Sequence, residues 1–393
     1  MTGPLIFLVA GEPSGDALGA SLMAGLRKLR PDVRFVGVGG ERMCAEGLES
    51  LFPMADLAVM GLAEVVPRLP NLVRRIRQTA AEVERLRPAA LVTIDAPDFS
   101  FRVARKLKGK GIPLIHYVAP TVWAWRPGRA RKIARFLDHL LVLLPFEPPW
   151  FEREGLGCTF VGHPVVESGA DRGDGARFRA AHGIPASAPL LCVLPGSRQG
   201  EVMRLLPVFA ATLERLRASH PDLRVVVPTV ANVAATVRRA TWPVPAVVVD
   251  GQAEKYDAFA AADAALAASG TVALELALAG TPTVVAYRVN RLTAWLARRL
   301  IRVRWVNLVN ILLDRGAVPE LLQEACSPDR LADELRSLLD DEAARQAQRD
   351  AGGLALAMLG RGGVSPGDRA ARAVLQQANQ LLGEGDGGQG AET

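Results

Sequence analysis

The sequence predicts an α/β protein built from two Rossmann-like domains that face each other across a cleft, followed by a helical C-terminal segment. Short apolar runs alternate with helical patterns along most of the chain, as expected of stacked β-α-β units. The alternation restarts after a stretch at 162–175 that contains several glycines and a proline, which indicates a linker. At 393 residues the chain is also longer than one hydrophobic core usually supports.

Each apolar run is expected to form a buried parallel strand, because such strands are covered by helices on both faces. In the first half the runs lie at 5–10, 33–38, 89–94, 112–118, 140–144 and 158–161. In the second half they lie at 190–194, 223–227, 246–249, 264–267 and 283–286. Beyond residue 312 we expect only helices, over 319–339, 342–359 and 366–382.

The domain limits follow from these patterns. We expect an N-terminal Rossmann-like domain at 1–165 and a second one at 176–345. Helices at 346–382 follow, and a glycine-rich tail at 383–393, which has no apolar periodicity, is expected to be disordered.

Composition narrows the classes of partner. The chain holds 47 basic and 41 acidic residues, a net charge of +6, which suits phosphorylated ligands or an anionic membrane but is too diffuse to indicate nucleic acid. Its four cysteines lack metal-ligand spacing and are expected to be buried free thiols in a reducing compartment. No basic residue precedes the first apolar run, which is therefore expected to be a strand and not a signal peptide. The longest stretch free of charged residues, 111–125, is too short to span a bilayer, so any membrane contact is expected to be peripheral.

The most informative stretch is the turn after the run at 190–194. Gly196 lets the backbone approach a ligand, and Ser197 and Arg198 supply donors at a helix start. A similar turn follows the run at 264–267, with Ser269, Gly270 and Thr271. Either turn alone is common capping chemistry, but together they favour a nucleotide or nucleotide sugar over a lone anion.

The first strand ends in another polar turn, with Glu12, Ser14 and Asp16. The turn lacks the GxGxxG spacing, and no acidic residue ends the second strand, so a hydride-transfer cofactor is not expected. The three side chains are placed where an acceptor hydroxyl or phosphate could bind. The alternative is that Ser14 caps the helix and Asp16 favours its dipole.

Two carboxylates follow the third strand of the first half. Asp95 stands at the carboxyl edge of the strand, where it can act as a general base on a hydroxyl, and Asp98 is suited to cap the next helix. We favour Asp95 as the base, with an exchange of the two roles as the alternative.

An aromatic segment follows the fourth strand. Trp123 and Trp125, with Arg126 after them, can hold a sugar face or an acyl chain beside a phosphate, or can equally wedge two domains together. Further upstream, aliphatic residues at Val66, Leu69 and Leu72 are interleaved with arginines, as in a helix that lies in a membrane interface; burial in the core is the alternative.

Taken in order, a series of motifs resembles the lipid-A-disaccharide synthase family over about residues 5–339. The motifs are GEPSGD, TIDAPDF, HYVAPTVWAWR, VGHP, LPGSRQGEV, ASGTVALE and NLVNILL with PELLQ. The resemblance implies an inverting glycosyltransferase of the GT-B type without a cofactor. It would transfer 2,3-diacylglucosamine from UDP-2,3-diacylglucosamine to 2,3-diacylglucosamine 1-phosphate, forming a β-1,6 bond and UDP.

The family pattern also assigns roles to single positions. It implies catalytic roles for Ser14 and Asp95, with Glu12 a further catalytic candidate beside them. On the donor side the implied residues are Arg198, Glu275, Asn310 and Gln323. The resemblance further implies a homodimer whose C-terminal segments are exchanged. The aliphatic and arginine segment around Leu69 separately predicts peripheral attachment of a cytoplasmic enzyme to the cytoplasmic face of the inner membrane.

Two other functions compete with this one. The first is another enzyme that uses a UDP-sugar, such as a sugar 2-epimerase or the murein glycosyltransferase. The second is a non-catalytic nucleotide-sensing or membrane-tethering module, because a fold alone does not establish activity. The carboxylates Glu12 and Asp95 near a phosphate site argue against a pure binding module.

Overall fold

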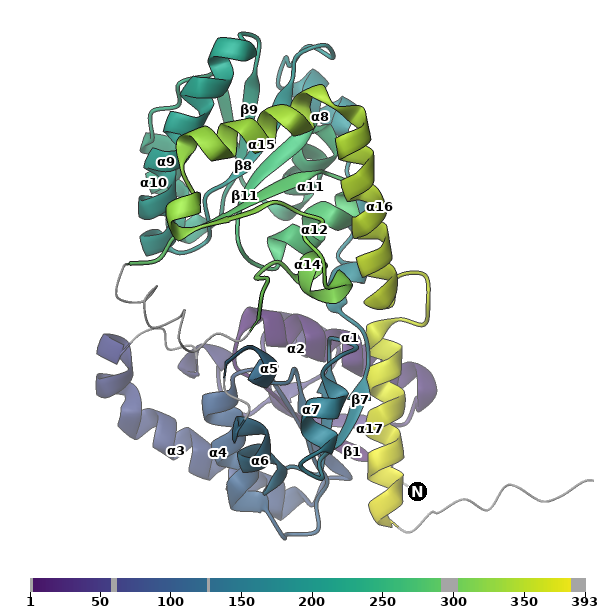
Figure 1. Ribbon diagram of the computed structural model, residues 1–393. Coiled ribbons are helices and arrows are strands. Elements are labelled where there is room, and N and C mark those ends of the chain that lie inside the picture. Colours follow the sequence, from purple (N-terminus) through teal and green to yellow (C-terminus); the bar gives the residue numbers. More distant parts are fainter. Residues whose placement is uncertain (1–2, 58–61, 126–127, 291–302, 383–393) are drawn as a thin grey trace, which may run out of the picture. The chain divides into compact units, whose positions relative to one another are not determined.

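The computed structural model describes residues 3–57, 62–125, 128–290 and 303–382, which form two compact units (Figure 1). The first unit contains Met1–Pro164 and Gly362–Thr393, and the second contains Val165–Arg361. The chain passes from one unit to the other at Pro164, inside the stretch in which we expected the linker.

The first unit is built on a seven-stranded sheet of order β3-β2-β1-β4-β5-β6-β7, in which neighbouring strands pair in parallel. The strands are β1 (Leu5–Ala10), β2 (Arg34–Val38), β3 (Glu49–Ser50), β4 (Ala90–Ile94), β5 (Leu114–Tyr117), β6 (His139–Val142) and β7 (Gly157–Phe160). The helices are α1 (Pro13–Leu29), α2 (Glu41–Ala45), α3 (Leu62–Leu86), α4 (Pro97–Leu107), α5 (Val122–Trp125), α6 (Gly128–Ala134), α7 (Pro148–Glu152) and α17 (Pro366–Leu382). The winding of the sheet reverses between β1 and β4.

The second unit repeats this plan with a six-stranded parallel sheet of order β10-β9-β8-β11-β12-β13. The strands are β8 (Leu190–Leu194), β9 (Arg224–Pro228), β10 (Ala246–Val249), β11 (Ala264–Ala268), β12 (Thr283–Tyr287) and β13 (Glu320–Leu322). The helices are α8 (Gly175–Ala181), α9 (Gln199–Ser219), α10 (Ala231–Arg239), α11 (Gln252–Ala261), α12 (Val272–Ala279), α14 (Leu308–Leu313), α15 (Pro328–Asp340) and α16 (Glu342–Met358). Here the winding reverses between β8 and β11.

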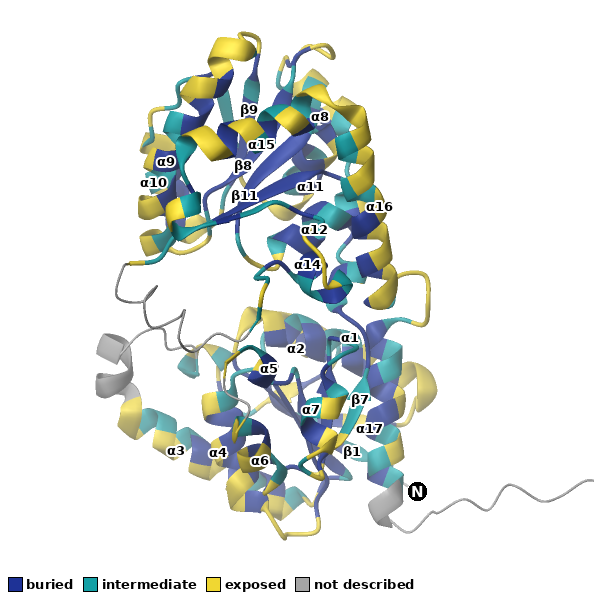
Figure 2. Ribbon diagram, in the orientation of Figure 1, coloured by how far each residue is buried: buried dark blue, intermediate teal, exposed yellow. Residues whose placement is uncertain are grey.

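The buried strands explain the apolar runs of the sequence. Every residue of β4, β8 and β11 is buried, and β8 and β11 appear dark blue in Figure 2. Central strands of this kind are covered by helices on both faces, so they need apolar side chains at every position and show no alternation.

The last helix, α17, packs against α1 in the same unit. Small residues let the two backbones approach closely, because a Cβ at Gly25 would lie 2.8 Å from the carbonyl oxygen of Gly367. Lys28 Nζ lies 2.7 Å from Asp368 Oδ2 across the same contact. Exchange of this helix between two chains stays a prediction.

Three expectations differ from the structure. Residues 319–339 are not one helix, because Glu320–Leu322 forms β13 at the edge of the second sheet and α15 begins only at Pro328. The C-terminal helices are divided between the units, α16 belonging to the second and α17 to the first. The short strand β3 had no matching apolar run, because both of its residues are exposed.

None of the helices in the described ranges combines the length and apolar character that a bilayer crossing requires.

Candidate active site

The polar segments singled out in the sequence follow the four strands at which the two sheets reverse their winding. Residues 11–16 follow β1, Asp95 follows β4, residues 196–198 follow β8 and residues 269–271 follow β11. In parallel α/β sheets, ligands bind outside the carboxyl ends of the strands at such switch points. Each unit therefore places its candidate residues where its topology favours a ligand.

In the first unit, the switch point brings Ser14 and Asp95 together. The Ser14 hydroxyl donates to Oδ2 of Asp95 over 3.5 Å, a long bond that leaves the carboxylate with capacity to accept further hydrogen bonds. Asp95 and Ala96 have left-handed φ angles of 50° and 42°, and such backbone costs about 1–3 kcal/mol per residue outside glycine. The turn is held because the Asp95 N–H donates to Tyr117 O at 2.9 Å and the Ser100 hydroxyl donates to Asp95 O at 2.9 Å.

Neighbouring residues refine the roles at this turn. Gly11 permits its close approach to β4, because a Cβ there would lie 2.7 Å from the Cβ of Ala96. Glu12 is the exposed N-cap residue of α1, and Asp98 is exposed in the first turn of α4. Ser14 lies inside the first turn of α1 and not at its N-cap, so the interpretation of Ser14 as the cap is wrong.

Asp16 has a structural role that the sequence analysis missed. It is 5 % exposed, and its carboxylate accepts hydrogen bonds from the N–H groups of Gly40, Arg42 and Met43 at 2.7, 3.0 and 3.1 Å. These groups form the N-terminus of α2, where a carboxylate satisfies otherwise unpaired donors. The expectation that Asp16 binds a ligand is therefore corrected, because its oxygens are used on α2, whereas its place in the first turn of α1 agrees with the alternative that it favours the dipole of that helix.

The two tryptophans have different environments. Trp123 is buried, its ring packs edge-to-face on Phe146 with centroids 5.1 Å apart, and its Nε1 donates to Oε1 of Glu147 at 3.2 Å. Burial raises the pKa of Glu147 to about 7, although the N–H of Leu144 also donates to it. Trp123 is thus a core residue in this structure, which corrects its expected contact with the ligand. Trp125 is 37 % exposed. Arg126 lies outside the described residues.

His116 lies on β5, the neighbour of β4, but is not suited to proton transfer. It is fully buried, and its Nδ1 is 2.8 Å from the hydroxyl of Thr93. Burial lowers the pKa of His116 to about 3, so the ring is neutral at physiological pH. His116 is therefore not an alternative to the carboxylates as the base.

In the second unit, the turn after β8 has the features of an anion site. Gly196 has φ of 120°, a conformation that favours glycine, and Arg198 is the exposed N-cap residue of the long helix α9. Asn232 Nδ2 donates to Ser197 O at 2.6 Å and so fixes the turn. Among the described residues the Arg198 guanidinium has no hydrogen-bond or ion-pair partner. It is therefore available to a phosphate.

An acidic side chain already occupies part of this turn. Oε2 of Glu201 accepts a hydrogen bond from the Ser197 N–H at 3.2 Å, and a side chain at Gly196 would collide with the same carboxylate. A bound phosphate would compete for this N–H group. Sequence reasoning gave Glu201 no role, although its place three residues after the N-cap is the spacing at which an acidic residue turns back to a helix start.

The second turn of this unit, after β11, is open. Gly270 and Thr271 are exposed, and a Cβ at Gly270 would meet no atom within 4 Å. Ser269 is held by its N–H, which donates to Ala286 O at 3.2 Å. Further along α12, both oxygens of Glu275 lie 3.0 Å from Lys255 Nζ. The phenol of Tyr256 donates to the same carboxylate at 3.1 Å, a partner that the sequence pattern did not reveal.

Two expected donor-side residues are engaged in local structure. Asn310 is fully buried, its Nδ2 donates to Val318 O at 2.8 Å and to Glu320 Oε1 at 2.7 Å, and its Oδ1 accepts from Val318 N at 2.9 Å. The Gln323 amide pairs with the backbone of Val289, donating to its oxygen at 3.2 Å and accepting from its N–H at 3.1 Å. A direct ligand contact by either side chain would require these bonds to open.

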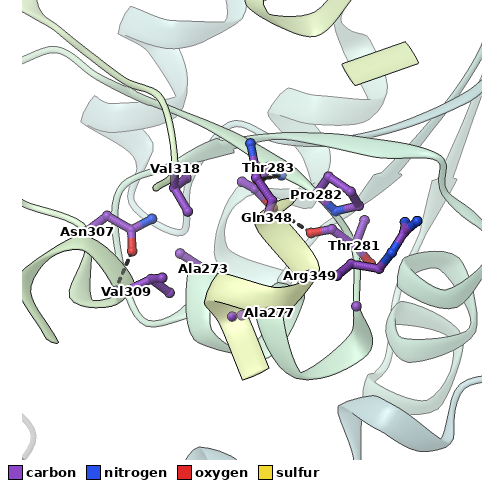
Figure 3. Close-up of a pocket in the computed structure, with 12 residues that line it drawn as sticks. Ala273, Ala277, Thr281, Pro282, Thr283, Asn307, Val309, Val318, Gln348 and Arg349 are labelled. Carbon is purple, nitrogen blue, oxygen red and sulfur yellow. Dashed lines mark hydrogen bonds between the residues drawn. The ribbon is translucent and has the colours of Figure 1, made fainter. Parts of the chain in front are cut away.

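The cavities of the two units differ in size, and only a large one can hold a ligand. A chamber of about 20 Å³ between α12 and α16 is lined by Asn307, whose buried Nδ2 has no partner among the described residues (Figure 3). It has room for a water molecule but not for a sugar. By contrast, a groove of about 1020 Å³ in the first unit has Pro13, Ser14, Phe52 and Met54 among the residues that line it.

Comparison with known proteins identifies the family. The family model for lipid-A-disaccharide synthetase matches residues 6–362. The lipid-A-disaccharide synthase of Rhodospirillum centenum is 63 % identical over 376 residues, which cover 94 % of each chain. That of Paramagnetospirillum magneticum is 55 % identical over 383 residues, covering 96 % of this chain and 98 % of its own.

Solved structures add the fold. MnaA of S. aureus, solved with UDP, superposes with a TM-score of 0.65 at 12 % identity and covers 97 % of both chains. MurG of Acinetobacter baumannii gives a TM-score of 0.56 at 14 % identity, covering 96 % of this chain and 100 % of its own. This likeness confirms the expected GT-B type of two Rossmann-like units, and together with the sequence matches it shows that the chain belongs to the lipid-A-disaccharide synthase family of glycosyltransferases.

Proposed function

We propose that the chain transfers 2,3-diacylglucosamine from UDP-2,3-diacylglucosamine to 2,3-diacylglucosamine 1-phosphate. The product is the β-1,6-linked disaccharide 1-phosphate, with UDP as the leaving group. The observation that carries this proposal is that the two switch points have different functional groups. A carboxylate with a hydroxyl partner, Asp95 and Ser14, stands at one sheet edge, and a glycine turn with an unpartnered guanidinium, Arg198, stands at the other.

The reaction needs a base on the acceptor. Asp95 accepts the proton of the acceptor's 6-hydroxyl, and the resulting oxygen attacks the anomeric carbon of the donor sugar from the face opposite UDP. The bond between that carbon and the β-phosphate oxygen breaks, so the configuration inverts. The long hydrogen bond from Ser14 orients Asp95. The left-handed turn at Asp95 and Ala96 fixes the direction in which the carboxylate points.

The departing UDP gains negative charge, which the second unit is suited to stabilise. Arg198 can grip two phosphate oxygens, and the backbone N–H groups at Ser197 and at the start of α12 supply further donors. Gly196 and Gly270 leave space for the phosphates to approach the backbone. Glu275, with its Lys255 partner, is assigned to the nucleoside side of the same site.

The acyl chains need an apolar surface near the base. The groove that Ser14 helps to line also has Phe52, Pro53 and Met54 in its wall, and we assign it to an acyl chain of the acceptor. Its position beside Ser14 keeps the sugar near Asp95 while the chain lies along the groove.

Attachment to the inner leaflet is the second part of the proposal. On α3, the side chains of Leu69 and Val73 are each 38 % exposed, although exposed aliphatics on a soluble helix are usually scattered. We assign these two residues to the headgroup region of the cytoplasmic face. Leu72 packs against the core of the first unit, which corrects its expected contact with lipid. The side chain of Val66 lies outside the described residues.

A product assay tests the proposed reaction. The purified chain is incubated with UDP-2,3-diacylglucosamine and 2,3-diacylglucosamine 1-phosphate in detergent, and products are identified by mass spectrometry and NMR. We expect equal amounts of UDP and of a β-1,6-linked disaccharide 1-phosphate, with no turnover of UDP-N-acetylglucosamine. Epimerised UDP-sugar would favour the epimerase alternative, and nucleotide binding without any product would favour a binding module.

A further inference from the structure

A basic pocket of the first unit has no role in the reaction as described so far. It has a volume of about 490 Å³ and lies between α4 and α6. Arg102 and Arg105 line it from α4, and Arg129 and Lys132 line it from α6. The spacing of three residues on each helix places both members of a pair on one face. Asp98 supplies the one carboxylate of the lining.

The four cations line one cavity without a counterion in the described part of the chain. Among the described residues, none of their head groups pairs with a carboxylate. The adjacent residue of α6, Arg131, pairs with Glu154 at 3.0 Å, and on α3 Arg75 pairs with Asp56 at 2.6 Å. Like charges that face one cavity repel one another, so this arrangement costs stability unless an anion neutralises it.

Aromatic rings hold two of the guanidinium groups in place. Arg105 Cζ lies 4.8 Å from the ring centre of Phe136, and Arg129 Cζ lies 5.7 Å from that of Phe101. Both rings are buried, so they form a fixed support. Cation–π contacts restrict the guanidinium groups before any ligand arrives, which lowers the cost of binding an anion.

The pocket adjoins the candidate base. Pro97 and Asp98, which begin α4, form part of its wall and lie two and three residues after Asp95 in the chain. An anionic group held here therefore keeps the rest of its molecule near Asp95.

We propose that the α4–α6 pocket binds the phosphate monoester of the acceptor, an inference that rests on the proposed function. A phosphate monoester carries a charge of about −1.5 to −2 at pH 7, and its oxygens can accept paired hydrogen bonds from arginine. The 1-phosphate is on C1, and C6 with its hydroxyl is on C5, the two carbons that flank the ring oxygen, so holding the phosphate limits where the 6-hydroxyl can lie. The donor carries its phosphates in a diester linkage, so the pocket also distinguishes acceptor from donor.

The test combines a double variant with a modified acceptor. Arg102→Gln with Lys132→Gln removes two charges that do not stack on an aromatic ring. With the acceptor 1-phosphate in neutral detergent, we expect its KM to rise roughly 10- to 100-fold, while the donor KM and thermal stability stay unchanged. The 1-O-methyl phosphodiester of the same acceptor should be a poor substrate for the unmodified chain, and the double variant should lose most of this discrimination. The control, Arg131→Gln, lies on α6 but pairs with Glu154 outside the pocket, and it should behave as the unmodified chain does.

The possible outcomes test the pocket assignment and the proposed function separately. If the unmodified chain makes no disaccharide from either acceptor, the proposed function fails. If it makes disaccharide and the double variant retains the full preference for the monoester, the pocket assignment alone is overturned. If the double variant loses binding to phosphatidylglycerol vesicles while the acceptor KM in detergent stays unchanged, the cations bind lipid headgroups and the assignment is also overturned.

Discussion

The two switch points have the same topology and opposite chemistry. At the first, between β1 and β4, polar side chains meet: Ser14 contacts Asp95 on a strained, left-handed turn. At the second, between β8 and β11, glycines and helix N-termini present backbone N–H groups, and Arg198 adds a cation. The fold therefore determines where a ligand binds, whereas the few residues after each strand decide which chemistry takes place there.

The two points also differ in how far they are formed without ligand. Asp95 is held by backbone bonds on both of its sides, from its own N–H to Tyr117 and from Ser100 to its carbonyl. In the second unit, the Ser197 N–H is engaged by Glu201, and this bond must open for a phosphate. The acceptor side is thus preorganised, and the donor side includes an internal competitor.

Removing the base should give the largest effect. Asp95→Asn should lower turnover by roughly two to four orders of magnitude, because the amide cannot accept the proton of the acceptor hydroxyl. The amide oxygen can still accept the Ser14 hydrogen bond, so the fold and UDP affinity should be retained. Steady-state kinetics and calorimetry with UDP measure the two properties. The matched control is Asp98→Asn, which should leave turnover within a fewfold of normal. The opposite ranking of the two variants would transfer the role of base to Asp98.

Glu147, a third carboxylate of the first unit besides Asp95 and Asp98, should affect the stability of the protein and not its turnover. In the folded protein the pKa of Glu147 is raised from 4.5 to about 7. Between these two pH values the folded protein therefore keeps a proton that the unfolded chain has lost. Stability should therefore fall as pH rises from about 4.5 to 7, by about 3 kcal/mol from this group.

The Glu147→Gln variant removes this charge, but its single amide oxygen can accept from only one of the Trp123 and Leu144 donors, which bind different oxygens of Glu147. Denaturant unfolding at pH 5 and pH 8 should show that the variant loses that part of the pH dependence and is less stable than the unmodified chain at pH 5, because one buried donor has lost its acceptor. If the variant instead lost turnover at unchanged stability, Glu147 would belong to the chemistry of this edge.

The donor side should lose affinity when its cation is removed. Arg198→Ala should weaken UDP binding by about 2–3 kcal/mol, and Arg198→Lys should recover only part of this, because an ammonium cannot make the paired hydrogen bonds of a guanidinium. Calorimetry with UDP measures both. Arg215→Ala, on the same helix but paired with Asp329, is the control and should bind UDP normally. Unchanged UDP affinity in Arg198→Ala would mean that Arg198 does not bind the diphosphate.

Whether the sequence predicts one of these features depends on how far apart in the chain its contacting residues are. The switch-point motifs were predictable because each lies within a few residues of an apolar strand, and strand order follows from repeated β-α-β units. The burial of Trp123 depends on Glu147, and the use of Asp16 depends on Gly40 and Met43, residues more than 20 positions away. Composition around Trp123 or Asp16 carries no signal of such partners.

Helix faces and edges were less predictable for a related reason. The aliphatic pattern of α3 does not reveal that Leu72 packs on the core while Leu69 and Val73 remain exposed, because this depends on how the helix is rotated on the sheet. Similarly, β13 is too short to show a period, and its pairing with β12 decides its conformation.

The exposed face of α3 provides a smaller effect on the acceptor side. Leu69→Ser with Val73→Ser should reduce co-sedimentation with anionic vesicles and raise the apparent KM for a long-chain acceptor several-fold, without a change in thermal stability. Leu72→Ser is the matched control, since it should lower stability by about 1–2 kcal/mol and leave vesicle binding intact. Reversed results for the two variants would place Leu72 in the interface and the other two residues in the core.

The smallest expected effect concerns the internal competitor on the donor side. Glu201→Gln removes a negative charge that occupies the turn at Gly196 and weakens the bond that holds the Ser197 N–H. UDP should therefore bind roughly two- to tenfold more tightly, since a hydrogen bond to a neutral acceptor and a relieved repulsion are each worth about 1 kcal/mol or less at an exposed site. The gain should shrink at high salt, because salt screens the repulsion between a carboxylate and a diphosphate. Calorimetry at low and high salt measures both effects, and Glu214→Gln, further along α9, is the control for a change in net charge. Weaker UDP binding in Glu201→Gln would mean that the carboxylate shapes the turn for the ligand and does not compete with it, and the donor side would then be as preorganised as the acceptor side.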